Sequence, residues 1–181
     1  MKSLTKLLLL ALLAMALPAF AQKVRLATTA GDIVLELNRE KAPKTVDNFM
    51  QYVKAGHYDG VIFHRVIDGF MIQTGGYKAD LSEKPVRAPI ALESRNGLSN
   101  LRGSIAMART NDPNSATAQF FINVNDNVRL DDAGGGYAVF GKVIEGMDVV
   151  DQIRLVPTRS VGVHGSLPEK AITIKKATVE K

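Results

Sequence analysis

The sequence feature that most constrains this chain is a series of short apolar segments separated by glycine, asparagine or aspartate. The segments are GVIFHRVI, FMIQTG, GSIAMAR, QFFINV, AVFGKVI and AITIKKATV, and they recur through the chain from residue 60 onward. Short apolar runs bounded by turn residues are typical of β-strands. Because no helix alternates regularly with these runs, the pattern favours an antiparallel sheet over a parallel one.

The first third of the chain supplies further elements. Residues 23–38 alternate apolar and polar side chains on either side of a TAGD turn, which predicts a β-hairpin. Residues 41–58 change to a helical period, with Pro43 near the start and Gly56 just past the end. The apolar positions at i, i+3, i+4 and i+7 are Val46, Phe49, Met50 and Val53. A second short helix is expected at residues 146–154, before Pro157.

Two helices among about eight strands predict a mainly β fold. An open sheet exposes unpaired strand edges, and closure into a barrel removes them. We therefore expect a closed eight-stranded antiparallel β-barrel capped by two α-helices, formed by residues 22–181 as one domain.

The N-terminus has the pattern of a secretory signal peptide. Two lysines precede an apolar run at residues 7–17, Pro18 ends the run, and the AFA of residues 19–21 supplies small residues where signal peptidase cuts. A transmembrane anchor is the alternative, but the run is shorter than the roughly 20 residues that span a bilayer. We expect cleavage between Ala21 and Gln22 and a periplasmic mature domain without membrane attachment, while full secretion stays open.

Charge and composition exclude several functional classes. Without residues 1–21 the chain keeps 21 of its 23 basic side chains and all 18 acidic ones, so its net charge falls from +5 to +3. This weak balance, with no long basic run, argues against a nucleic-acid partner. The absence of cysteine excludes disulfides, thiolate metal sites, cysteine nucleophiles and a lipid-modified N-terminal cysteine. We expect a monomer without a cofactor or metal.

The stretch FHRVIDGFMIQTGG, residues 63–76, places a cation among large apolar side chains. A desolvated charge is costly unless a partner compensates for it. Arg65 therefore either pairs with a buried carboxylate or waits for a ligand in a place where water cannot screen its charge. Its neighbour His64 is interpreted as a packed structural residue, since His57 and His164 form no metal-ligand spacing with it.

Three blocks of the sequence together resemble the cyclophilins, a family of peptidyl-prolyl cis-trans isomerases. The blocks are YDGVIFHRVIDGFMIQTGG, RGSIAMARTNDPNSATAQFFINV and YAVFGKVIEGMDVV, and their order and spacing match the family from about Val24 to the C-terminus. The chain is most similar to exported bacterial members. The resemblance implies an eight-stranded barrel with two helices, in agreement with the strand pattern. It also implies that the partners are proline-containing polypeptides, unfolded or still folding.

The resemblance further implies which residues form the site. Arg65 stands at the position of the catalytic arginine. The residues that wall the proline pocket are Phe70, Met71, Phe121 and Leu130. The residues that contact the substrate backbone are Gln73 and Gln119 through their side chains, and Ala108 and Arg109 through main-chain groups. Tyr137 stands where many eukaryotic members have a histidine.

Local sequence arguments bear on some of these residues. Phe120 and Phe121 are adjacent on an expected strand, so they face opposite sides, and the resemblance assigns Phe121 to the groove. Gln73 and Gln119 could instead cap strand edges. Arg129 departs from the family, which usually has an aromatic residue, often tryptophan, at this position. Because an apolar macrocycle would have to desolvate this arginine without pairing it, we expect weak binding of the inhibitor cyclosporin.

Two other functions compete with an isomerase. A proline-peptide binding module or holdase would use the same groove without turnover, but it would need no cation aimed at the proline nitrogen. A serine hydrolase is disfavoured because no G-x-S-x-G element surrounds the serine of GSIAMAR.

The signal-peptide pattern makes a prediction about processing. Expression in a bacterium with an intact export pathway should yield a mature protein that begins at Gln22, because cleavage follows the small residues of AFA. N-terminal sequencing of the exported protein measures this. A membrane fraction that retains residues 1–21 would contradict it.

Overall fold

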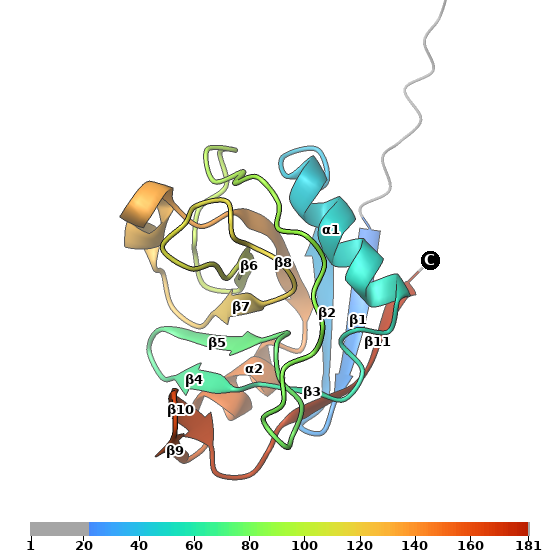
Figure 1. Ribbon diagram of the computed structural model, residues 1–181, viewed down its shortest axis with the longest axis vertical. Helices are drawn as coiled ribbons and strands as arrows, with labels where there is room; N and C mark the ends of the chain where they lie inside the picture. The colour runs from blue at the N-terminus through green and yellow to red at the C-terminus, as the bar shows by residue number, and fades with distance from the viewer. Residues whose placement is uncertain (1–21, 181) are drawn as a thin grey trace, which may run out of the picture.

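The computed structural model of the protein describes residues 22–180, so the expected signal peptide lies outside the described residues. Its main element is a curled sheet of nine strands in the order β3-β11-β1-β2-β8-β6-β7-β5-β4, with every pair antiparallel (Figure 1). The strands are β1 Gln22–Thr28, β2 Asp32–Leu37, β3 Val61–Ile62, β4 Arg65–Ile67, β5 Met71–Thr74, β6 Ser104–Met107, β7 Phe120–Asn123, β8 Val139–Glu145 and β11 Thr173–Glu180.

Two α-helices pack against this sheet. Helix α1, Pro43–Lys54, contacts β11, whereas α2, Met147–Arg154, contacts β2, β4 and β5 (Figure 1). Two short 3₁₀ helices, η1 Val128–Asp131 and η2 Ala133–Gly135, follow β7. The mainly β fold with two helices is therefore confirmed. No helix within residues 22–180 is long and apolar enough to cross a membrane.

The expected closed barrel of eight strands is wrong. The segment GVIFHRVI was expected as one strand, but β3 pairs with β11, β4 pairs with β5, and residues 63 and 64 belong to neither strand. The two outer strands of the sheet are therefore consecutive in the chain without forming a ladder with each other, and the sheet is a curled half-barrel. Closure needs a strand that pairs on both sides along its length, and neither short piece does so.

A separate two-stranded sheet was not anticipated from the sequence. It consists of β9, Thr158–Val161, and β10, His164–Pro168, and it lies beside β4 (Figure 1). Every residue of β9 is exposed or only partly buried, so the segment lacks the apolar alternation that marks a half-buried strand.

The hydrophobic core lies inside the curled sheet, where α1 closes one side of it. The ring of Phe49 on α1 has its centroid 5.2 Å from those of Tyr58, Phe120 and Phe140. All four rings are fully buried. Removing an aromatic ring from such a core typically costs about 3–5 kcal/mol of stability. The predicted apolar face of the helix is thus the contact that fixes α1 on the sheet.

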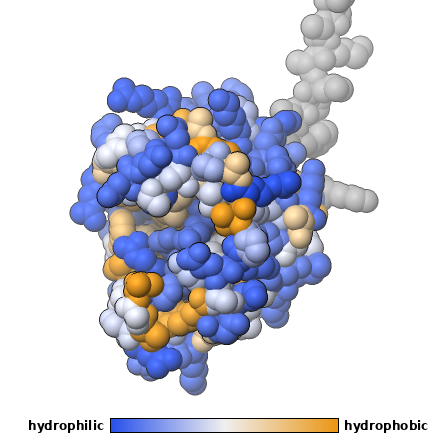
Figure 2. Space-filling model, viewed as in Figure 1, coloured by the Kyte–Doolittle hydropathy of each residue, from blue (hydrophilic) through white to orange (hydrophobic). Residues whose placement is uncertain are grey.

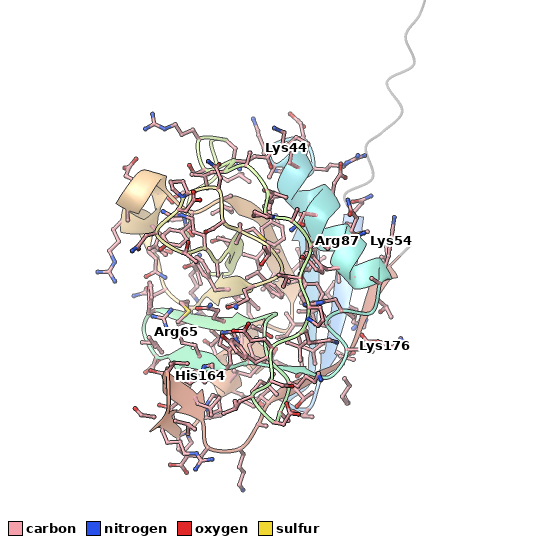
Figure 3. The ribbon with its side chains drawn as sticks, viewed as in Figure 1. Lys44, Lys54, Arg65, Arg87, His164 and Lys176 are labelled. Carbon is pink, nitrogen blue, oxygen red and sulfur yellow. The ribbon has the colours of Figure 1, made fainter. Side chains whose placement is uncertain are left out.

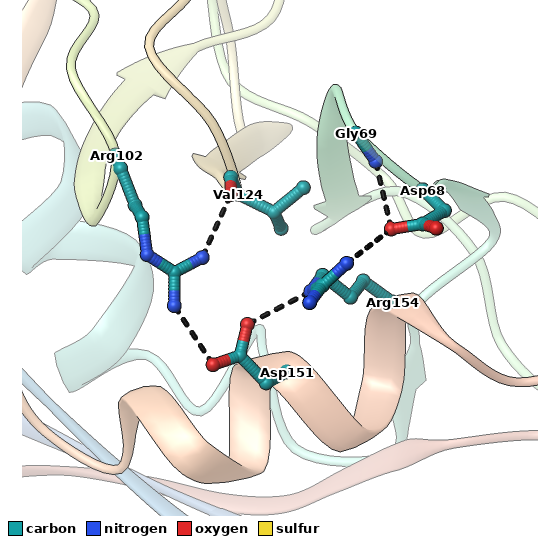
Figure 4. Close-up of polar contacts among 6 residues, drawn as sticks. All are labelled: Asp68, Gly69, Arg102, Val124, Asp151 and Arg154. Carbon is teal, nitrogen blue, oxygen red and sulfur yellow. Dashed lines mark hydrogen bonds and ion pairs between the residues drawn. The ribbon is translucent and has the colours of Figure 1, made fainter.

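Ion pairs attach α2 to the end of the sheet that carries the candidate site (Figure 4). Asp151 accepts hydrogen bonds from Arg102 at 2.7 Å and from Arg154 at 2.8 Å, and both arginines lower the pKa of its carboxyl group. Arg154 also pairs with Asp68 in the β4–β5 turn, and Arg102 donates to the carbonyl of Val124 just after β7. A network of this kind orients its members better than an isolated surface pair does.

The surface is mostly hydrophilic on the face shown in Figure 2, and its hydrophobic residues form limited patches. The most exposed large apolar side chain is Val163, between β9 and β10, at 91%. Scattered exposure of this kind is normal for a folded domain.

Two glycines with similar positive φ angles give a matched stability test. Gly146, before α2, has φ +84°, and a Cβ there would lie 2.1 Å from the carbonyl oxygen of Asp32. Gly60 has φ +79° with open space around it. Gly60→Ala should cost only the left-handed strain, about 1–2 kcal/mol. Gly146→Ala should cost at least about 2 kcal/mol more, because the chain must also shift. Urea unfolding of both variants measures this, and equal losses would contradict it.

Candidate active site

The β4–β5 hairpin determines which side chains reach the candidate site. Arg65 lies opposite Gln73 and Ile67 lies opposite Met71, so these four share one face of the hairpin. Val66, between them in sequence, points to the other face and is buried in the core. The alternation of side chains along two short strands therefore separates the site face from the core face.

Strand β7 extends this site face. Phe121 pairs with Gln73, and it belongs to a second apolar cluster with Met71 and Leu130. Its neighbour Phe120 belongs to the main core. The predicted division of the two phenylalanines between groove and core is what the structure has.

A pocket of about 160 Å³ opens on this face. Its lining comprises nine of the ten residues expected from the sequence: Arg65, Phe70, Met71, Gln73, Ala108, Arg109, Phe121, Leu130 and Tyr137. The tenth, Gln119, does not line the pocket but accepts a 2.9 Å hydrogen bond from Gln73 through its side-chain oxygen. The structure thus brings together residues that span 73 positions of the chain, from 65 to 137.

The floor of the pocket is apolar and well packed. Met71, Phe121 and Leu130 are all buried, and the ring of Tyr137 meets that of Phe121 edge to face at 5.8 Å. Phe70 is only partly buried at the rim. Such a surface suits a small apolar ring, because binding removes the apolar area of the ring from water.

Arg65, the first residue of β4, lies at the edge of this floor (Figure 3). Its Nη1 donates to Gln73 Oε1 at 3.2 Å and lies 3.8 Å from the sulfur of Met71, and its guanidinium carbon lies 5.9 Å from the Phe70 ring centroid. No carboxylate forms an ion pair with Arg65 within residues 22–180. The alternative of a structural ion pair is therefore wrong.

The expectation that Arg65 is shielded from water is also wrong for the free protein. The residue is exposed, because it extends from an outer strand over the pocket rather than into the core. Solvent screens its charge until a ligand covers it. Any desolvation of the guanidinium must therefore come with the bound ligand.

The two residues after β6 contribute in different ways. The Ala108 amide already donates to the carbonyl of Gln119 at 3.0 Å, so its own carbonyl is the group left for a peptide. The Arg109 side chain stacks over the Tyr137 ring, with 4.4 Å from the guanidinium carbon to the ring centroid. It donates hydrogen bonds to the carbonyls of Thr110, Ala133, Gly134 and Gly136. Arg109 thus connects its own loop to the one that carries Tyr137.

A buried amide network supports the pocket from behind, and sequence reasoning missed it. Asn123 donates to Asn100 at 3.2 Å and to Ser104 at 2.9 Å, and its own oxygen accepts from Asn127 at 2.7 Å. Asn127 also donates to the carbonyl of Phe70 at 2.7 Å. The only signal in the sequence is the presence of Asn123 and Asn127 in and just after an apolar run, where a polar group must find partners.

Arg129 also belongs to the surroundings of the pocket. It is exposed on η1, and its guanidinium carbon lies 5.4 Å from the Phe70 ring centroid. Phe70 therefore contacts two cations, Arg65 and Arg129.

His64 is buried and does not line the pocket. Its ring lies 4.7 Å from the ring of Tyr77 and 5.9 Å from that of His164, the first residue of β10. Burial, with a smaller effect of His164, lowers the pKa of His64 to about 4. Its Nδ1 is buried without a hydrogen-bond partner, which agrees with a neutral, structural ring.

A larger hollow, of about 800 Å³, lies along β2 and the loop of residues 97–102. None of the expected site residues lines it. Size alone does not assign chemistry, and the smaller pocket is the one where an unpaired cation meets an apolar floor. Within residues 22–180 no group of three or more histidine, aspartate or glutamate side chains could hold a metal ion.

Comparisons with known proteins give a family match over almost all of the described chain. Residues 23–179 match the model of the family described as cyclophilin type peptidyl-prolyl cis-trans isomerase/CLD. The chain is 56% identical over 161 residues to peptidyl-prolyl cis-trans isomerase cyp18 of Streptomyces antibioticus, which covers 86% of this chain and 97% of the relative. It is 49% identical over 159 residues to peptidyl-prolyl cis-trans isomerase B of Escherichia coli, covering 85% and 97%.

Solved structures give the same picture. A Cryptosporidium parvum cyclophilin type peptidyl-prolyl cis-trans isomerase matches with a TM-score of 0.76 and 28% identity, covering 90% of this chain and 99% of that one. A crystal structure of the same protein in the presence of the dipeptide Ala-Pro matches with a TM-score of 0.75 and 29% identity, covering 88% and 99%.

The lowered pKa of His64 predicts a pH dependence of stability. The unfolded state, with an ordinary pKa near 6.5, takes up the proton first as the pH falls, so stability is full above about pH 6.5 and decreases toward pH 4. This residue alone should cost about 2 kcal/mol between pH 7 and pH 5. Urea unfolding at both values should show a smaller loss in His64→Phe than in the wild type, and NMR titration should give a low ring pKa. A ring pKa near 6.5 would contradict the prediction.

Proposed function

The chain belongs to the cyclophilin family of peptidyl-prolyl cis-trans isomerases, and we propose that it accelerates X-Pro rotation in exported polypeptides by stabilising the twisted amide with Arg65. The observation that carries the proposal is the Arg65 guanidinium, which has no ion-pair partner among residues 22–180 and lies beside an apolar pocket of about 160 Å³. The Ala-Pro dipeptide used with the related C. parvum protein supports proline-containing peptides as the ligand class.

The energetic task of such an enzyme is modest. Rotation about a peptide bond faces a barrier of about 18–20 kcal/mol. A barrier of about 20 kcal/mol allows roughly one event per hundred seconds, and reaching about a thousand per second requires a reduction of about 7 kcal/mol. No covalent bond breaks and no proton has to move, so binding the twisted amide more tightly than the planar one is sufficient.

Arg65 can supply a part of this difference. In the twisted amide the prolyl nitrogen regains a lone pair, which the planar ground state does not offer. A guanidinium N–H then gains an acceptor only in the transition state. One charge-assisted hydrogen bond contributes about 1.5–3 kcal/mol. Gln73 accepts from Nη1 of Arg65, and this contact orients the guanidinium plane before the substrate arrives.

The rest of the reduction in the rotation barrier is assigned to the pocket that surrounds the bound peptide. Arg65 is exposed in the free protein, and a bound peptide would cover it, so its interaction with the prolyl nitrogen would strengthen as water leaves. The apolar floor would hold the ring, while Gln119 and the Ala108 carbonyl would hold the chain on either side of the rotating bond. Fixing both sides of the bond limits motion to the reacting torsion.

The setting of this activity is also part of the proposal. The signal-peptide pattern of residues 1–21 supports export to the periplasm, and the clients would then be exported proteins whose slow X-Pro steps limit folding. Weak cyclosporin binding stays a prediction, and it is supported by the exposed charge of Arg129 beside Phe70.

A binding module or holdase that uses the same groove is the competing function. It would need the apolar floor but no orienting contact between Arg65 and Gln73. Variants of Arg65 distinguish the isomerase from the binding module. In an isomerase, loss of the cation should reduce turnover much more than it reduces peptide binding.

We expect Arg65→Ala to lower kcat/KM by at least about 100-fold, since a donor that acts mainly in the transition state is lost. Arg65→Lys should lose most of the activity as well, because a flexible ammonium lacks the planar set of donors. A protease-coupled or NMR exchange assay on a short proline peptide measures both. Arg87→Ala, which removes an exposed arginine near α1, is the control and should keep wild-type activity (Figure 3).

Activity of either Arg65 variant within a few-fold of wild type would refute the mechanism. The pH profile gives a second check on it. Burial lowers the pKa of His64 to about 4, so its ring stays neutral from about pH 6 to 8, and burial also lowers the pKa of His57. We expect kcat to be nearly flat across that range, and a steep bell-shaped profile would instead indicate proton transfer.

A further inference from the structure

Three guanidinium groups lie at or beside the lining of the proline pocket. Arg65 and Arg109 line the pocket, and Arg129 lies over Phe70, the ring that Arg65 also approaches. None of the nine residues that line the pocket is acidic. The charged side chains that line the pocket are therefore all cationic, although the chain as a whole is only weakly basic.

The three arginines differ in how far their hydrogen-bonding capacity is already used. Arg109 donates to four backbone carbonyls and stacks on Tyr137. Arg65 donates to Gln73. The Arg129 side chain is exposed, and within residues 22–180 it forms neither a hydrogen bond nor an ion pair. Its guanidinium group lies over the Phe70 ring. Arg129 is therefore the rim cation most available to a ligand.

The acidic residues near this rim do not neutralise Arg129. Asp131 accepts hydrogen bonds from Ser99 and Asn100; burial alone would raise the pKa of its carboxyl group, but these hydrogen bonds together lower it. Asp68 pairs with Arg154 on α2. Asp132 is exposed just after η1 but forms no ion pair with Arg129. Within the described part of the chain, no carboxylate forms an ion pair with Arg129.

We propose that Arg129 determines specificity by favouring X-Pro bonds flanked by glutamate or aspartate over those flanked by lysine. This inference rests on the proposed isomerase function, because it assumes that proline occupies the pocket. Side chains next to that proline would project over the rim, well within the roughly 10 Å over which charges interact at 0.1 M salt. A guanidinium matches a carboxylate with two parallel hydrogen bonds and repels an ammonium group.

Stacking on Phe70 makes this preference stronger than a mobile surface charge would. An exposed ion pair usually gains little, because two long side chains must be immobilised. The Phe70 ring already restrains the Arg129 guanidinium, so less freedom is lost when a carboxylate binds.

The test uses peptides whose only charge is the one under study. Acetylated and amidated proline peptides carry glutamate, glutamine or lysine either directly after the proline or two residues before it. NMR exchange spectroscopy gives kcat/KM for each peptide. In at least one of the two positions we expect the glutamate peptide to be turned over about tenfold better than the lysine peptide at low salt, with the ratio falling to about threefold or less at high salt.

Two matched variants assign the preference to a residue. Arg129→Gln should bring the ratio of glutamate to lysine peptides close to one, whereas Arg87→Gln removes an equal charge near α1 and should leave the ratio as in the wild type (Figure 3). A wild-type ratio near one at both peptide positions would overturn the proposal. A ratio that survives Arg129→Gln would overturn it as well.

The glutamine peptide separates this inference from the proposed function. Its turnover by the wild-type protein reports isomerase activity without any charged flank. Normal turnover of the glutamine peptide with no charge preference would refute the role of Arg129 alone. A wild-type protein that turns over none of the peptides would overturn both the function and the preference.

Discussion

The geometry of the site depends on the hydrogen bonds of the buried Asn123 side-chain amide. It is completely excluded from solvent, so each of its polar atoms must find a protein partner. It finds them in Asn100, Ser104 and Asn127, and Asn127 in turn holds the carbonyl of Phe70. A network of this kind is worth more as a whole than its single bonds suggest, because a missing member leaves buried groups unpaired. A network of buried hydrogen bonds therefore holds the backbone that carries the apolar pocket.

With this hydrogen-bond network in place, the apolar floor of the pocket and the Arg65 side chain can differ in rigidity and hydration. The floor of Met71, Phe121 and Leu130 is buried and continuous with packed strands, whereas Arg65 extends over it into solvent. Leaving the cation hydrated avoids the cost of a permanently buried, unpaired charge. Pairing it with a carboxylate would also avoid that cost, but it would occupy the donors that the proposed mechanism needs. An exposed arginine oriented by a neutral glutamine satisfies both requirements.

The same arrangement explains why Phe70 is central to the rim. Its carbonyl is held by Asn127 and Val124 from behind, and its ring is approached by Arg65 and Arg129 from the solvent side. The position of a rim cation relative to the pocket is therefore fixed by the backbone of the β4–β5 turn. That turn is in turn fixed to α2 through Asp68 and Arg154. Elements far apart in sequence thus act on one aromatic ring.

The sequence by itself determined the features that depend on local periodicity and residue type. These include α1 with its apolar face, the β1–β2 hairpin, and the opposite orientations of Phe120 and Phe121. Resemblance between short motifs supplied the residues that line the pocket. Only the tertiary structure decided that the sheet stays an open half-barrel, that Arg65 is exposed, and that three asparagines form one buried network. Those outcomes depend on contacts between residues that are far apart in the sequence. Burial, strand pairing and the hydrogen bonds of buried polar groups are set by such contacts and not by a local sequence pattern.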